Sequence, residues 1–282
     1  MANSVNTNRG ALIALQNLNA TNRALEVTQN RVNTGLKVSS AKDNGAIFAI
    51  ATSQRAEMGA QDAVKQSLQR GQSIVDVALA AGETVVEALT ELKSLAVAIQ
   101  DVAVGSPSAD KLHNDFTALV AEIRASLAGA TFDGVNLYSA NAAAIQVSTN
   151  TSGGKFDLKV AAGTAGGAIA ADGSIDPTIT TTATAFNFDT LTTRTAANVD
   201  RAINNFTSVL ADFGTKSKSL ERQLTFVGKL QDSLETGIGN LVDADLAKES
   251  ARLTALQTKQ QLGVQALSIA NQASSIVLNL FR

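Results

Sequence analysis

The sequence predicts a mainly α-helical protein, in which both chain halves form an elongated antiparallel coiled-coil-like helical bundle with a small β-hairpin insertion in the middle. Apolar residues recur at alternating three- and four-residue steps through both ends of the chain, as in helices that pack against each other. The core must consist mainly of Ala, Leu, Val and Ile, because the 282 residues include no Trp, one Tyr and two Met. A central stretch rich in Gly, Thr, Ala and Asp interrupts the helical periodicity.

Composition excludes several classes of function. The 23 basic and 25 acidic residues give a net charge of -2, so no basic field attracts nucleic acid. The absence of Cys removes disulfides and thiolate metal sites. No apolar run is long enough to cross a membrane, and the polar start from Met1 to Gly10 lacks the features of a signal peptide. Composition alone therefore suggests a cytoplasmic protein.

The first helical segment has a weak apolar seam. Asn22 and Gln29 fill two of its core-type positions, and several further Asn residues each cost about 0.6 kcal/mol relative to Ala in a helix. We therefore expect that this helix is not stable by itself. Its seam residues, which we expect to bury on polymerisation, are Leu15, Leu18, Leu25, Val32 and Leu36.

Two further helices are expected before the central stretch. After a break at Asn44–Gly45, a long helix runs toward Val102 and ends at Gly105-Ser106-Pro107. A third helix is expected to start at Ser108 as its N-cap and to end around Ala128–Gly129. Helical periodicity then resumes from Val199 to Leu241. The expected bundle core includes Leu92, Leu95, Phe116, Phe206, Leu220 and Leu224.

The central stretch contains short alternating pieces, Ile145–Val147 and Phe156–Val160, which we expect to form hairpins. The region from Asn141 to Phe188 should face solvent, because its Gly and Thr content offers little apolar surface.

The last helix, from Asp243, differs from an ordinary surface helix because Lys259 is the only charged side chain between Leu253 and Phe281. Two adjacent apolar stripes run along it, and its polar residues are mostly uncharged Gln and Asn. We expect other chains to surround it, and we expect both termini to order only on assembly. The residues expected to bury on polymerisation are Leu253, Leu256, Leu262, Leu267, Ile269, Ile276, Leu280 and Phe281.

Four strings in these segments resemble bacterial flagellin. They are Thr34–Ile50 (TGLKVSSAKDNGAIFAI), Thr131–Leu137 (TFDGVNL), Asp243–Glu249 (DADLAKE) and the ending from Ala270 to Arg282. The resemblance covers about the first 137 and last 90 residues. We accordingly divide the chain into an N-terminal polymerisation helix (1–40), two halves of the bundle core (41–130 and 195–242), a β-hairpin and variable surface region (131–194) and a C-terminal polymerisation helix (243–282).

The resemblance implies a secreted subunit that is exported unfolded through the flagellar type III apparatus and polymerises into the extracellular filament for swimming motility. Its implied partners are copies of itself, alone or mixed with other flagellins, together with flagellar cap proteins, hook-filament junction proteins and an export chaperone. In many flagellins the helix read by a host toll-like receptor carries Arg where this sequence has Glu91. The reversed charge at this immune-recognition position implies weaker recognition.

Three other functions were weighed. A hook-filament junction protein would resemble flagellin at both ends, although the Lys42–Ile50 and Asp243–Glu249 strings favour flagellin. A cytoplasmic coiled-coil scaffold should carry charged flanking positions, which the last helix lacks. An enzyme is the weakest class, since His113 is the only histidine and Asp243 with Asp245 is better explained as helix capping. No catalytic, cofactor-binding or metal residues are expected.

Overall fold

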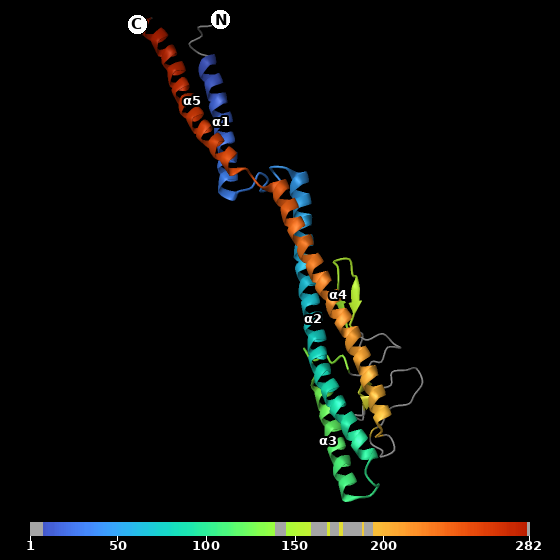
Figure 1. Ribbon diagram of the computed structural model, residues 1–282. Coiled ribbons are helices and arrows are strands. Elements are labelled where there is room, and N and C mark those ends of the chain that lie inside the picture. The colour runs from blue at the N-terminus through green and yellow to red at the C-terminus, as the bar shows by residue number, and fades with distance from the viewer. Residues whose placement is uncertain are drawn as a thin grey trace. The chain divides into compact units, whose positions relative to one another are not determined.

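The computed structural model describes residues 8–138, 145–158, 168–169, 175–176, 188 and 194–280. Its helices are α1 (Arg9–Thr34), α2 (Gly45–Gln100), α3 (Pro107–Gly129), α4 (Ala196–Val242) and α5 (Leu246–Leu280). The strands are β1 (Gln146–Ser148), β2 (Lys155–Asp157), β3 (Ala168–Ile169) and β4 (Ile175–Asp176). The prediction of a mainly α-helical fold with a small hairpin insertion is confirmed (Figure 1).

Contacts within the chain divide it into two compact units, one formed by residues 1–58 with 232–282 and the other by residues 59–231. The second unit holds the larger core, in which α2, α3 and α4 pack together. On α2 the buried positions keep the alternating steps of a coiled-coil seam from Val64 through Leu68, Val75, Ala78, Val85, Leu89 and Leu92 to Ala96. Of the expected core residues, Leu92, Phe116, Phe206 and Leu220 are buried, and Leu95 and Leu224 pack partly buried against the same cluster.

The only tyrosine of the chain stands at the centre of this core. The ring of Tyr138 stacks on Phe206 with centroids 5.6 Å apart and meets Phe213 edge to face at 5.6 Å. Its hydroxyl donates a hydrogen bond to the carbonyl of Ala78 on α2, at 2.5 Å. Burial raises the pKa of this hydroxyl well above its usual range. Tyr138 thus joins the segment after α3 to both long helices.

The start of α3 differs from the prediction. Ser106, and not Ser108, is the N-cap, because its hydroxyl accepts a hydrogen bond from the Ala109 amide at 3.2 Å. Pro107 then occupies the first helical position, where its fixed φ suits the helix and its missing N–H has no intrahelical partner to lose. Proline therefore begins this helix as well as separating it from α2.

Arg194 secures α3 to the entry of α4. Its Nε donates to the Phe188 carbonyl at 2.9 Å and its Nη1 to the His113 carbonyl at 3.0 Å. The guanidinium also lies over the Phe116 ring, 5.3 Å from its centroid. His113 therefore lies beside a buried cation that joins two elements of the fold.

The two hairpin pieces expected from the sequence pair with each other, since β1 and β2 are antiparallel with Val147 opposite Phe156. This hairpin is not wholly solvent-facing: Val147 and Leu158 are buried in the helical core. Gly71 of α2 makes room for Val147, whose side chain a Cβ at that position would overlap. A second small pair, β3 with β4, is antiparallel. Most of the remaining stretch from Asn141 to Phe188 lies outside the described residues, including Lys159 and Val160.

Candidate functional site

The two ends of the chain pair as helices α1 and α5 in the unit formed by residues 1–58 and 232–282 (Figure 1). Near one end of the pair, Asn8 Nδ2 donates to the Ala270 carbonyl at 2.7 Å. Farther along, Gln260 Nε2 donates to Asn22 Oδ1 at 2.8 Å. Later residues of α1 therefore contact earlier residues of α5, so the two helices are antiparallel.

The buried seam of α1 differs from the predicted seam by one residue at two positions. Thr21 and Thr28 are buried, whereas Asn22 and Gln29 are exposed, so the assignment of those two residues to the seam was wrong. Thr21 Oγ1 donates to the Asn17 carbonyl at 2.9 Å, which allows its methyl group to be buried with the hydroxyl satisfied.

The expected polymerisation residues of α1 are divided by this seam. Leu18, Leu25 and Val32 are half-buried against the partner helix, and Leu15 is exposed. Leu36 follows the end of the helix and forms a β-bridge with Asp243. The large exposed apolar residues of α1 are Leu12, Ile13, Leu15 and Val27.

The two apolar stripes of α5 have different environments. Leu253, Leu256 and Leu267 are half-buried in the chain. Leu262 and Ile269, which are seven residues apart on one face, are 62% and 61% exposed, and Val264 is exposed on another side of the helix. Ile276 and Leu280 are described only as helical backbone, and Phe281 lies outside the described residues. The pair therefore leaves an uncovered apolar stripe on α5 as well as on α1.

Close approach between the helices depends on small residues. A Cβ at Gly263 would lie 3.3 Å from Leu18 Cδ1, which is tighter than most carbon contacts. Gly263 thus lets the Leu18 side chain pack directly onto the α5 backbone. Because the seam also contains Thr21, Thr28 and Ala270, it buries little apolar volume per turn.

One partly buried ion pair crosses the seam. Arg31 Nη1 lies 3.0 Å from Glu249 Oε1, and the Glu249 side chain is nearly inaccessible. The pair joins the last turn of α1 to the first turn of α5. Sequence reasoning missed this ion pair, because its only signals in the sequence are an Arg at a helix end and a Glu at a helix start.

Backbone bonds fix the base of the pair. Gly35 ends α1 in the left-handed region at φ 72°, and its carbonyl accepts from the Ala244 amide at 2.8 Å. The Lys37 amide donates to the Val242 carbonyl at 2.6 Å. Asp245 caps α5 by accepting from the Lys248 amide at 3.1 Å, as expected, whereas Asp243 takes part through the β-bridge with Leu36.

The turn before α2 is organised by one carboxylate. Asp43 Oδ2 accepts from the amides and hydroxyls of Ser39 and Ser40 at 2.9–3.2 Å. Hydrogen bonds from the Ser40 amide and the Ser39 hydroxyl, which favour the charged form, hold the pKa of Asp43 below its ordinary value. Asn44 then caps α2 by accepting from the Ala46 and Ile47 amides. These residues belong to the TGLKVSSAKDNG string, whose polar residues therefore build a turn.

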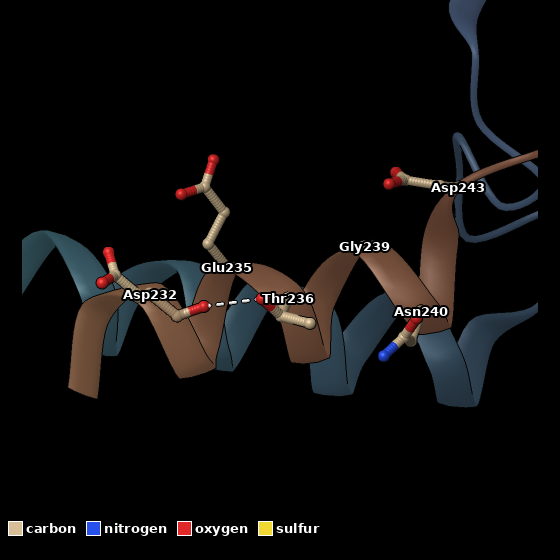
Figure 2. Close-up of a pocket in the computed structure, with 6 residues that line it drawn as sticks. All are labelled: Asp232, Glu235, Thr236, Gly239, Asn240 and Asp243. Carbon is tan, nitrogen blue, oxygen red and sulfur yellow. Dashed lines mark hydrogen bonds between the residues drawn. The ribbon is translucent and has the colours of Figure 1, made fainter. Parts of the chain in front are cut away.

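A shallow acidic groove lies on the last turns of α4 (Figure 2), lined by Asp232, Glu235, Thr236, Gly239, Asn240 and Asp243. The Thr236 hydroxyl in it is occupied locally, since it donates to the Asp232 carbonyl at 2.8 Å. In the part of the chain that the structure describes, no three His, Cys, Asp or Glu side chains group as metal ligands. Among those same residues, no helix is both long and apolar enough to cross a membrane.

Paired terminal helices with uncovered apolar stripes, in a chain that also contains a separately cored helical unit, are typical of a self-assembling structural subunit. The family model described as bacterial flagellin N-terminal helical region matches residues 5–143, and the bacterial flagellin C-terminal helical region matches residues 196–281. The chain belongs to the bacterial flagellin family, whose members are structural subunits of the extracellular flagellar filament.

Similarity to individual flagellins extends over the full chain. The chain is 50% identical to flagellin FljM and 48% identical to flagellin FljK of Caulobacter vibrioides, in each case over 99% of both chains. It is 38% identical to a flagellin of Brucella melitensis, again over 99% of both chains. These relatives are named flagellins, and nothing in them favours the alternative of a hook-filament junction protein.

Proposed function

We propose that this subunit polymerises through the exposed stripes of α1 and α5, with no enzymatic activity and no cofactor. The observation that carries the proposal is the exposure of large apolar side chains on a helix pair that already uses another face for its own seam. Ile13, Leu262 and Ile269 are all more than half exposed. Each such side chain gains about 1.5–3 kcal/mol when it is transferred fully from water into an apolar contact. Neighbouring copies of the same pair supply that contact in a polymer.

We further propose that ordering of the termini is coupled to assembly. The α1–α5 seam buries Thr21 and Thr28 and has Gly263 opposite Leu18, so its apolar gain is small. Ordering each residue costs about 1–2 kcal/mol of backbone entropy, which a narrow seam offsets poorly. Burial by several neighbours adds the missing area, and a free chain with unpaired ends is protected from premature polymerisation.

Membership of the family supports the remaining roles that we propose. The chain is exported through the flagellar type III apparatus with the help of a chaperone, and it is added under the cap of a filament joined to the hook by junction proteins. Residues 1–40 and 243–282 act as the polymerisation helices, and residues 41–130 and 195–242 form the core of the subunit. Glu91 is exposed on α2, so its negative charge is available to weaken toll-like receptor recognition.

The test separates the exposed stripe from the seam. Leu262→Ser with Ile269→Ser should abolish filaments seen by electron microscopy, because it removes apolar surface that contacts nothing large within the chain. The matched control, Gln261→Ser with Gln265→Ser, changes exposed polar residues of the same helix and should polymerise normally. Deletion of Leu267–Arg282 should also abolish filaments while the unfolding transition followed by Tyr138 emission stays nearly unchanged. Normal filaments from the Leu262→Ser with Ile269→Ser chain, or from the deleted chain, would refute the assignment.

A further inference from the structure

The outward faces of α2 and α4 carry opposite charges. On α2, four acidic residues recur along one face, and Asp76, Glu83, Glu87 and Glu91 are all exposed. On α4, the basic stripe consists of Lys218, Arg222 and Lys229, which are also exposed. At 100° per residue, each stripe lies on the side of its helix opposite the buried seam.

Most of these side chains form no ion pair within their own chain, although Asp76 accepts a hydrogen bond from Gln72 at 2.9 Å. No ion pair involves Glu83, Glu87 or Glu91, nor Lys218 or Arg222, among the residues that the structure describes. By contrast, charges nearer the seam are paired, as Lys93 is with Asp200 at 2.6 Å. The charges of Glu83, Glu87 and Glu91 on α2, and of Lys218 and Arg222 on α4, therefore remain available for a partner outside the chain.

An apolar anchor stands within the basic stripe. Phe226 is 57% exposed, with Arg222 and Lys229 one turn away on either side along the same helix face. An exposed aromatic ring flanked by cations is a typical centre for a protein contact.

We propose that the basic stripe of one subunit, with Phe226 at its centre, docks on the acidic α2 stripe of a second copy. The contact is heterologous, since one face of the unit meets a different face of its neighbour, and such contacts generate open helical polymers when the rotation between neighbours does not close a ring. This inference rests on the proposed function as a filament subunit, and it assigns a lateral contact to the unit formed by residues 59–231, separate from the terminal helices.

The positions of the stripes also predict a stagger between neighbours. Gln72 bonds Ser217 and Gln231 bonds Asp62, each at 2.6 Å, so the basic stripe is level with the part of α2 that precedes Asp76. The two stripes are displaced by roughly 17 residues, which at about 1.5 Å per residue is about 25 Å along the helices. Docked copies should be shifted by this distance.

Charge reversal tests the pairing. Lys218→Glu with Arg222→Glu, or Glu83→Lys with Glu87→Lys, should raise the critical concentration for polymerisation roughly tenfold or more, because attraction becomes repulsion. Combining all four changes in one chain should restore filaments. The charge-matched control is Asp115→Lys with Glu122→Lys on exposed positions of α3, which should polymerise normally. Tyr138 emission and thermal unfolding should be unchanged in every variant, because all of these side chains are exposed.

Crosslinking supplies an independent readout, because the chain contains no Cys. A filament grown from a mixture of Glu87→Cys and Arg222→Cys chains should give dimers with a short bis-maleimide, whereas Asp115→Cys mixed with Arg222→Cys should not. Polymerisation unaffected by either reversal, failure of the combined chain to recover, or equal crosslinking in both mixtures would overturn the inference. If the unaltered chain forms no filaments, the proposed function itself fails, and that result is visible in the same assay.

Discussion

Gly82→Ala should destabilise the subunit through Tyr138. Gly82 is buried on α2, and a Cβ added there would lie 2.6 Å from the Tyr138 hydroxyl oxygen as well as overlapping Leu210. The tyrosine cannot move aside easily, since its ring is held between Phe206 and Phe213 and its hydroxyl is bonded to Ala78. The added methyl group therefore displaces either the ring or the neighbouring leucine.

The magnitude follows from three contributions. Overpacking a filled core costs about 1–3 kcal/mol. Weakening the hydrogen bond of a buried hydroxyl adds about 1–3 kcal/mol. Replacing Gly by Ala inside a helix returns about 1 kcal/mol. The free energy of unfolding should therefore fall by about 1–5 kcal/mol.

The matched control is Gly228→Ala on α4, where an added Cβ would meet nothing within 4 Å. That change should stabilise the chain by about 0.4–1 kcal/mol, because it restricts only the unfolded state. Urea unfolding of the dispersed chain, followed by tyrosine emission, measures the change in unfolding free energy for both variants. Because the chain has one Tyr and no Trp, the signal comes from Tyr138 alone. Equal shifts in the same direction for the two variants would refute the reasoning.

Further substitutions test other contacts. Leu220→Ala or Phe206→Ala should cost about 2–5 kcal/mol in the same unfolding assay, because both side chains are buried, and an unchanged transition would contradict the packing described for α4. Arg194→Met should cost about 1–3 kcal/mol of stability by leaving the Phe188 and His113 carbonyls without their donor. Arg194→Lys should not restore this stability, since an ammonium group cannot reproduce the two separate N–H donors of the guanidinium. The lowered pKa of Asp43 stabilises the folded turn above about pH 4, its unfolded value, and this contribution is lost as the pH falls through the folded pKa. Asp43→Asn should remove that acid-side dependence, and a carboxyl that titrates in NMR at its ordinary pKa would contradict the hydrogen-bond assignment.

The helices were predictable because their information is local. The break at Asn44–Gly45 is where α2 begins, and the end expected at Ala128–Gly129 is where α3 ends. The Asn44 side chain and the Gly105-Ser106-Pro107 turn act through bonds to residues a few positions away. Even there, the sequence analysis predicts the N-cap of α3 at Ser108, whereas Ser106 is the cap, because Pro107 both ends the preceding helical pattern and begins the next helix.

The sequence alone therefore determined the family, the helical fold and the unusual lack of charge on the last helix, because repeated apolar spacing and long motifs do not depend on distant contacts. Only the tertiary structure decided which face of each helix is used. It placed Thr21 rather than Asn22 in the α1 seam and joined Arg31 to Glu249 across the chain. Neighbouring stripes on a helix differ by a rotation of only about 100°. The choice between them rests on the shape and hydrogen bonds of a partner helix, which residue spacing does not encode.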